Sequence, residues 1–132
     1  MKIAEHVAKA KRFEDTIQKL DVQADYEIIN WARMHVCTHL LNGALHARGV
    51  TPENWDIRHT WYLEQHPDPA HLYKKLDSEC REALKVLTIF EGLRQTHVRG
   101  EGPFGPEVTL LAEKALNQIK EFCHRIVSSP SQ

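Results

Sequence analysis

The sequence predicts an all-α protein: an up-and-down four-helix bundle with an additional short helix or crossing segment. Apolar residues return every three or four positions in four long segments, which is the period of a helix with one buried face. No segment shows the strict alternation of a strand, and stretches rich in Gly and Pro separate the periodic segments. The 132 residues are enough for one core, so we expect a single helical-bundle domain over residues 1–127 and a frayed C-terminal tail over 128–132.

The first two helices are expected over residues 3–20 and from Asp21 to about Arg48. Asp21 is suited to cap the second helix, and Gly49 is suited to end it in a left-handed conformation. The length and apolarity of the second helix predict a central place in the bundle. The apolar stripe of the first helix consists of Ile3, Val7, Ala10, Phe13, Ile17 and Leu20.

Thr51 followed by Pro52 is a pattern typical of the start of a helix. The aromatic segment 55–66 predicts a short helix or an ordered crossing segment. Asp68 is expected to cap a third long helix that ends at Gly100. The linker 100–106 is too rich in Gly and Pro for regular structure. A last amphipathic helix follows, and its apolar face consists of Val108, Ala112, Ala115, Ile119, Phe122 and Ile126.

The composition predicts a cytoplasmic protein that does not cross a membrane. The formal net charge is -1, so no global positive field attracts nucleic acid. No apolar run approaches the ~20 residues of a membrane span, and the first residues lack a signal-peptide pattern. Cys37, Cys80 and Cys123 form no CxxC pair, so we expect buried free thiols rather than a zinc knuckle or a disulfide framework.

Three charged residues occupy positions that the helical period assigns to an apolar face. Arg33 lies in the apolar arc of the second helix, and Arg94 lies on the stripe of the third, with Glu91 one turn before it. Because a buried guanidinium without a partner is costly, we expect Arg33, Glu91 and Arg94 to approach one another. They predict either an ion pair that fixes helix register or, with His97, a polar pocket that binds an anionic group such as a phosphate or a nucleotide.

Histidines form a second stripe on the predicted second helix. His35, His39 and His46 lie within about 60° of one another at 100° per residue. The first two are four residues apart, a spacing that can bind zinc, and His59 in the crossing segment could complete a site. No carboxylate shares this stripe, so we expect no metal and no other cofactor. If a metal is bound, the candidate ligands are His35, His39, His46 and His59.

Three runs of the sequence resemble the HEPN superfamily of helical bundles (higher eukaryotes and prokaryotes nucleotide-binding). They are the helix end from Leu40 to Gly49, the histidine-containing segment 59–63, and the aromatic helix end with its arginine over 90–100. A polar linker and a final amphipathic helix complete the resemblance. It implies a non-catalytic domain that forms a homodimer and binds a partner protein or a nucleotide-like or phosphate-like ligand. A nucleotidyltransferase or a toxin–antitoxin protein is the kind of partner that it implies.

The sequence leaves two other functions open, a metal-independent ribonuclease and a histidine-rich metal-binding bundle. The ribonucleases within this superfamily share a motif in which four to six residues separate an arginine from a histidine. Arg33 and His39 fit this spacing but fall on different faces of their helix, and Arg94 and His97 are closer together than it requires. In either pair the histidine would take the 2′-hydroxyl proton, and the arginine would stabilise the developing phosphorane charge.

No nucleophile elbow and no phosphate-binding glycine loop after a strand is present, so no catalytic residue is assigned. The tryptophans Trp31, Trp55 and Trp61 are more large aromatic residues than one small core needs. Since aromatic side chains are enriched at protein interfaces, they also favour a homodimer.

Overall fold

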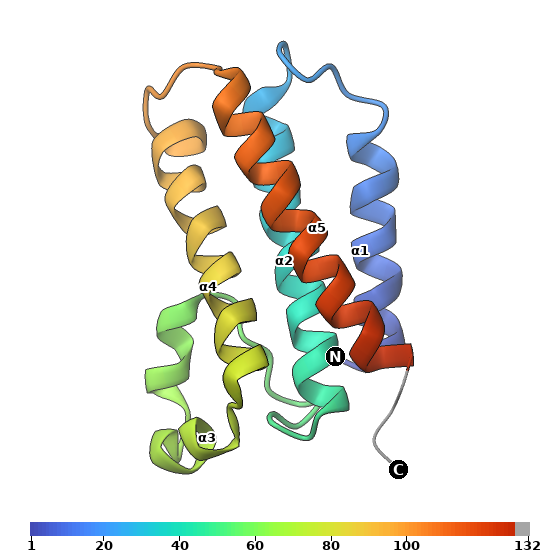
Figure 1. Ribbon diagram of the computed structural model, residues 1–132, viewed down its shortest axis with the longest axis vertical. Helices are drawn as coiled ribbons and strands as arrows, with labels where there is room; N and C mark the ends of the chain where they lie inside the picture. The colour runs from blue at the N-terminus through green and yellow to red at the C-terminus, as the bar shows by residue number, and fades with distance from the viewer. Residues whose placement is uncertain (129–132) are drawn as a thin grey trace.

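The computed structural model describes residues 1–128 and confirms the all-α prediction (Figure 1). Four long helices run in alternating directions along the bundle: α1 (Ile3–Ile17), α2 (Tyr26–Ala47), α4 (Ser78–Leu93) and α5 (Pro106–Ser128). The predicted crossing segment joins α2 to α4. It contains the 3-10 helix η1 (Thr60–Gln65), and the short helix α3 (Pro69–Lys75) lies between it and α4, within the predicted third helix. A π-helical turn, η2 (Arg94–Arg99), continues α4.

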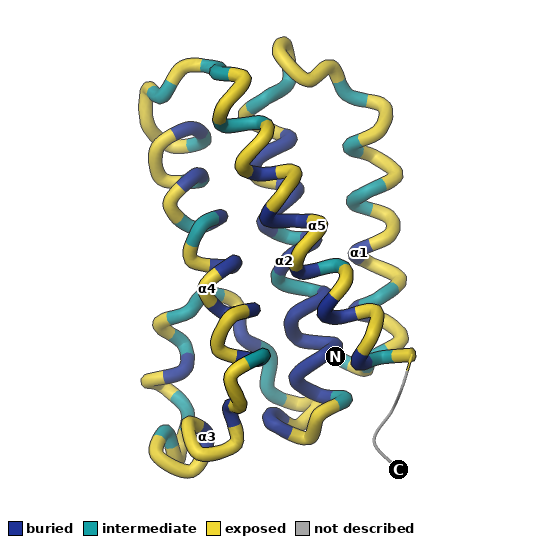
Figure 2. The backbone as a smooth tube through the Cα atoms, in the orientation of Figure 1, coloured by how far each residue is buried: buried dark blue, intermediate teal, exposed yellow. Residues whose placement is uncertain are grey.

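The helix α2 is the centre of the bundle and packs against α1, α4 and α5. It is buried over most of its length, whereas α1 and α5 each present an exposed side (Figure 2). This burial explains why α2 is apolar nearly all round rather than along one stripe. Its fully buried neighbours include Leu87 and Phe90 of α4 and Ile119 of α5. Among residues 1–128, no helix combines the length and the apolarity that a membrane span requires.

Two helix ends follow the predicted chemistry. Gly49 adopts the left-handed conformation with φ 71°, and the amide of Val50 donates to the carbonyl of Leu45, 2.9 Å away. The carboxylate of Asp68 accepts a hydrogen bond from the amide of His71, which caps α3. The cysteines Cys37, Cys80 and Cys123 are buried and free.

Three boundaries differ from the prediction. The helix α2 begins at Tyr26, because the carboxylate of Asp21 accepts from the amides of Gln23 and Ala24 and forms a turn instead of a cap. No helix starts at Thr51, whose hydroxyl faces a side chain of α2.

The predicted third helix is divided at Leu76 and Asp77. Leu76 is extended, and the carboxylate of Asp77 accepts from the amide of Cys80 at 2.8 Å, which starts α4 afresh. The apolar period continues across this break, so the period alone does not reveal it. The predicted tail falls on Ser128, the last residue of α5, and on residues 129–132, which lie outside the described part.

Candidate functional site

The structure does not bring Arg33 to Glu91 and Arg94. The guanidinium of Arg33 is buried and faces α5, where Nη2 lies 3.6 Å from Oε1 of Glu113. Glu91 instead accepts hydrogen bonds from the amide and the hydroxyl of Thr60, at 2.8 and 3.1 Å, and so holds the start of η1. The predicted meeting of the three charges is therefore wrong. Helical periodicity places Arg33 on a buried face of α2, but α5 covers that part of the face.

Arg94 is half-buried, and no carboxylate in the described part of the chain lies within 4 Å of its guanidinium. It lines two neighbouring hollows. The first, called here the arginine groove, has a volume of about 460 Å³ and is lined by His59, Trp61, Glu91, Arg94, Gln95 and Arg99. The ring of His59 stacks on exposed Trp61 with centroids 5.8 Å apart and an angle of 12° between planes.

The second hollow, called here the histidine cavity, has a volume of about 360 Å³. It lies between the start of α1, the middle of α2 and the loop after α2, with Arg94 at its edge. Its lining contains four histidines, whereas the lining of the arginine groove contains one. The lining residues are Met1, His6, Met34, His35, Thr38, His39, Asn42, Asp56, Ile57, Arg58, His59 and Arg94.

His97, the fourth predicted ligand-binding residue, lines neither hollow. Its ring is buried and meets Tyr26 edge-on at 6.3 Å between centroids. Nδ1 of His97 has no hydrogen-bond partner among the described residues, and Gly102 packs so closely that a Cβ there would lie 2.7 Å from this nitrogen. His97 therefore packs beside the linker, and Arg94 and His97 do not face a common space.

The histidine stripe of α2 is real, but its members have different surroundings. His35 stacks on Phe13 of α1 and contacts Trp31, with ring centroids 5.4 and 4.2 Å away. Nδ1 of His39 lies 3.0 Å from Nδ1 of His6. The predicted pair of His35 and His39 therefore does not converge on one point, and His59 belongs to the stack with Trp61.

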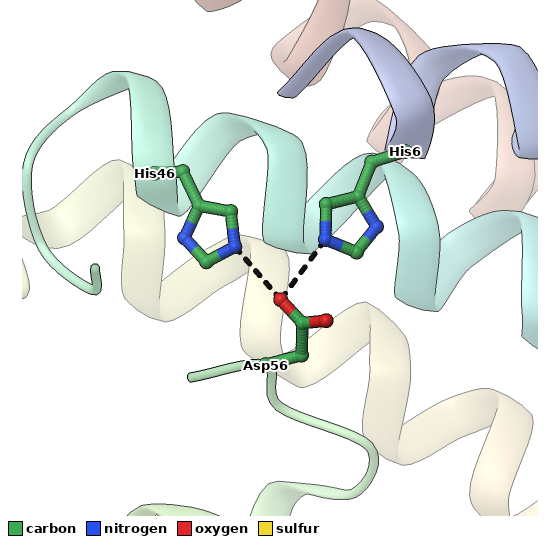
Figure 3. A group of neighbouring side chains, drawn as sticks. All are labelled: His6, His46 and Asp56. Atoms are coloured by element: carbon green, nitrogen blue, oxygen red, sulfur yellow. Dashed lines mark hydrogen bonds and ion pairs between the residues drawn. The ribbon is translucent and has the colours of Figure 1, made fainter. Parts of the chain in front are cut away.

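The convergent side chains are His6, His46 and Asp56, called here the histidine–aspartate cluster (Figure 3). Nε2 of His6 and Nε2 of His46 lie 3.0 and 2.8 Å from the same carboxylate oxygen, Oδ1 of Asp56. The three residues come from α1, α2 and the loop that follows α2. Both imidazoles are buried, whereas the carboxylate is about a quarter exposed.

Several contacts fix the loop that carries Asp56. The side-chain amide of Asn42 donates to the carbonyl of Ile57 and accepts from its amide, both at 2.7 Å. Nδ1 of His46 lies 2.8 Å from the hydroxyl and 3.1 Å from the carbonyl oxygen of Thr51. The terminal amine of Met1 lies 3.2 Å from Oδ2 of Asp56 and so contacts the oxygen that the histidines leave free.

Burial and neighbouring groups lower the pKa of two histidines, His6 and His39, and that of the Asp56 carboxylate. Burial lowers the pKa of His6, and burial with the nearby His6 and Lys9 lowers the pKa of His39 to about 4. Burial by itself raises the pKa of Asp56, but the hydrogen bonds from His46 and His6 outweigh it, so that the pKa is lowered.

The positive charge of Arg94 acts on the other side of the histidine cavity. Burial, followed by the charge of Arg94, lowers the pKa of both His35 and His59. At neutral pH the charge in this part of the cavity therefore comes from arginines rather than from histidines.

Sequence reasoning identified His46 as a candidate but missed His6 and Asp56 as its neighbours. A signal for His6 was present: it lies four residues before Ala10, on the line that continues through Phe13 and Ile17. A histidine at that position faces the core. Asp56 carried no periodic signal, since it lies in a loop whose path depends on the contacts of Asn42 and Thr51.

No protein-family model, curated protein or solved structure matches this chain. The HEPN resemblance therefore stays a prediction.

Proposed function

We propose that the chain is a non-catalytic, HEPN-like helical domain that binds a phosphate-bearing ligand beside Arg94. The observation that carries this proposal is the position of that guanidinium, between two hollows and without an acidic partner in the described residues. A guanidinium offers a rigid fork of donors that matches the oxygens of a phosphate. Glu91 lines the same groove, but its oxygens accept hydrogen bonds from Thr60, so the guanidinium of Arg94 keeps its donors for an anion from outside the chain.

The arginine groove contains further groups that suit such a ligand. Arg99 lies in the same groove and adds a second positive charge, and the stacked rings of His59 and Trp61 offer a flat apolar surface. A nucleotide has both of the complementary parts, a planar base and a phosphate. The arginines lie on the π-helical turn η2, and π-helical turns occur frequently at functional sites.

The alternative ribonuclease function has less support, because neither of its Arg–His pairs shares a hollow. Arg94 lines the arginine groove while His97 is buried beside the linker, and Arg33 faces Glu113 while His39 contacts His6. Incubation with labelled RNA, with and without a chelator, tests this alternative directly, and metal-independent cleavage would contradict the non-catalytic proposal.

The proposal is tested by titrating the purified chain with inorganic phosphate and with adenosine monophosphate in a calorimeter. Because a hydrogen bond to a charged group contributes about 1.5–3 kcal/mol, Arg94→Ala should weaken binding by roughly 10- to 100-fold. The variant should remain folded, since no carboxylate is left without its partner. Arg12→Ala, which removes an exposed arginine of α1, is the matched control and should bind as the parent does.

Two results would contradict the proposal. One is a parent protein that binds neither probe; the other is an Arg94→Ala variant that binds them as tightly as the parent. The two probes also separate two contributions. Tighter binding of the nucleotide than of phosphate would support a contribution of the stacked rings of His59 and Trp61.

The resemblance also supports a homodimer and a partner such as a nucleotidyltransferase or a toxin–antitoxin protein. Two of the three tryptophans have large exposed fractions, 42% for Trp31 and 49% for Trp61. Trp55 is partly buried and packs edge-on against His66. Trp31 and Trp61 are therefore the tryptophans that we propose for contacts with a second chain.

A further inference from the structure

The histidine–aspartate cluster has the composition and the convergence of a metal centre. Two imidazole nitrogens and one carboxylate oxygen, from His6, His46 and Asp56, all lie within 4.8 Å of one another (Figure 3). In a tetrahedral zinc site, bonds of about 2.0–2.1 Å place neighbouring ligand atoms roughly 3.3 Å apart. The observed separations of 2.8 and 3.0 Å are shorter by a few tenths of an ångström, which small side-chain rotations can supply.

The outer contacts of the two histidines fit the same arrangement. A ligating histidine normally donates the hydrogen on its other nitrogen to an acceptor, which fixes the tautomer and the plane of the ring. Nδ1 of His46 has such an acceptor in the carbonyl oxygen of Thr51 at 3.1 Å. Nδ1 of His6 has one in Nδ1 of His39 at 3.0 Å. With both Nδ1–H groups donated outward, both Nε2 lone pairs point to the position beside Oδ1 of Asp56.

The contacts can also be satisfied without an ion. In that case each Nε2–H donates to Asp56, the hydroxyl of Thr51 donates to Nδ1 of His46, and His39 donates to His6. The two arrangements differ only in which histidine nitrogens carry hydrogen, and the positions of the non-hydrogen atoms are the same in both. Binding of a metal ion is therefore the observation that separates them.

We propose that His6, His46 and Asp56 form a binding site for one divalent transition-metal ion of the zinc type. Two histidines and a carboxylate are the three-ligand set of many zinc sites that keep a fourth position for water or another ligand. Here the fourth position lies on the side of the histidine cavity, which His6 and Asp56 both line. Both Nε2 atoms converge on Oδ1 of Asp56, so the ion is bound through that oxygen; the amine of Met1 lies 3.2 Å from Oδ2 and 3.4 Å from Oδ1.

The site is independent of the anion site proposed beside Arg94, although both face the histidine cavity. Of the candidate ligands that the sequence suggested, the site uses only His46. His39 is a positioning residue: its Nδ1 contacts Nδ1 of His6, and it would not contact the ion itself.

The test is a zinc titration of the full chain after treatment with a chelator and removal of that chelator, followed by calorimetry. The parent should bind one Zn²⁺ per chain, and Zn²⁺ should raise its melting temperature. Asp56→Asn, which keeps the size of the side chain, and His46→Gln should each weaken binding at least ~100-fold. His39→Phe should weaken it less, by about 10- to 100-fold.

The control is His124→Gln, which removes an exposed histidine from α5 and should leave the titration unchanged. Circular dichroism of each variant shows whether it is folded, and His6→Gln replaces any variant that is not. A parent chain that binds no Zn²⁺ would overturn the proposal, whatever the variants do. Equal zinc affinity of the parent and folded Asp56→Asn would overturn it too. Arg94→Ala should bind Zn²⁺ as the parent does, so that failure of the anion proposal and failure of this one are distinguishable.

Discussion

Replacing Asn42 with alanine should lower the free energy of unfolding by about 3–4 kcal/mol. The buried amide of Asn42 satisfies both backbone groups of Ile57, a fully buried residue that makes no other backbone hydrogen bond within residues 1–128. An alanine leaves an N–H and a C=O of Ile57 buried and unpaired, and each such group costs about 1–3 kcal/mol. The carbonyl of Thr38, which Asn42 also contacts, keeps its place in the helical ladder of α2.

The measurement is urea denaturation followed by circular dichroism. With a slope of about 2 kcal/mol per M, the transition midpoint of Asn42→Ala should fall by roughly 2 M. Asn117→Ala is the control, because Asn117 is exposed on α5, and it should change the stability by about 0.5 kcal/mol or less. A loss smaller than about 1 kcal/mol for Asn42→Ala would refute the reasoning, because the loop would then have another way to satisfy Ile57.

Two further predictions concern the thiols and the assembly state. Burial raises the pKa of the thiols of Cys37 and Cys123, and raises that of Cys80 to about 12. Because the thiolate is the reactive form, iodoacetamide at mildly alkaline pH should leave the native protein unmodified and should label all three thiols in urea, which intact-mass measurement detects. Rapid labelling of the folded chain would contradict this burial. If the chain is a homodimer, light scattering at high micromolar concentration should give twice its 15.3 kDa, and a monomer mass there would rule the dimer out.

Much of the fold could be predicted because it follows from local rules. The apolar period located the four long helices, and Gly49 and Asp68 identified two of their ends through backbone conformation and capping. The break at Asp77 could not be found in the same way. Leu76 and Cys80 both satisfy the apolar period, so the pattern does not distinguish a continuous helix from two helices that meet at a cap.

The site was predictable only in part, because helical periodicity gives the face of a residue and not the helix that covers it. Arg33 was correctly placed on a buried face, yet the partner was Glu113 of α5 rather than Glu91 of α4. Likewise His46 was a candidate ligand, but its neighbours come from α1 and from a loop. Contacts between residues as distant in sequence as His6 and Asp56 depend on the packing of whole helices, which no local pattern encodes.

The order of residues along the chain has a consequence for how the protein is made. His6, His39, His46 and Asp56 all lie within the first 56 positions, on α1, α2 and the adjoining loop. A ribosome adds about 5–20 residues per second, so the polar side of this helical hairpin can assemble on the nascent chain before α5 has been synthesised. The sides of α2 that pack against α4 and α5 stay uncovered meanwhile. Because the contacts among these residues involve neither α4 nor α5, they can form in the hairpin before those helices pack against α2.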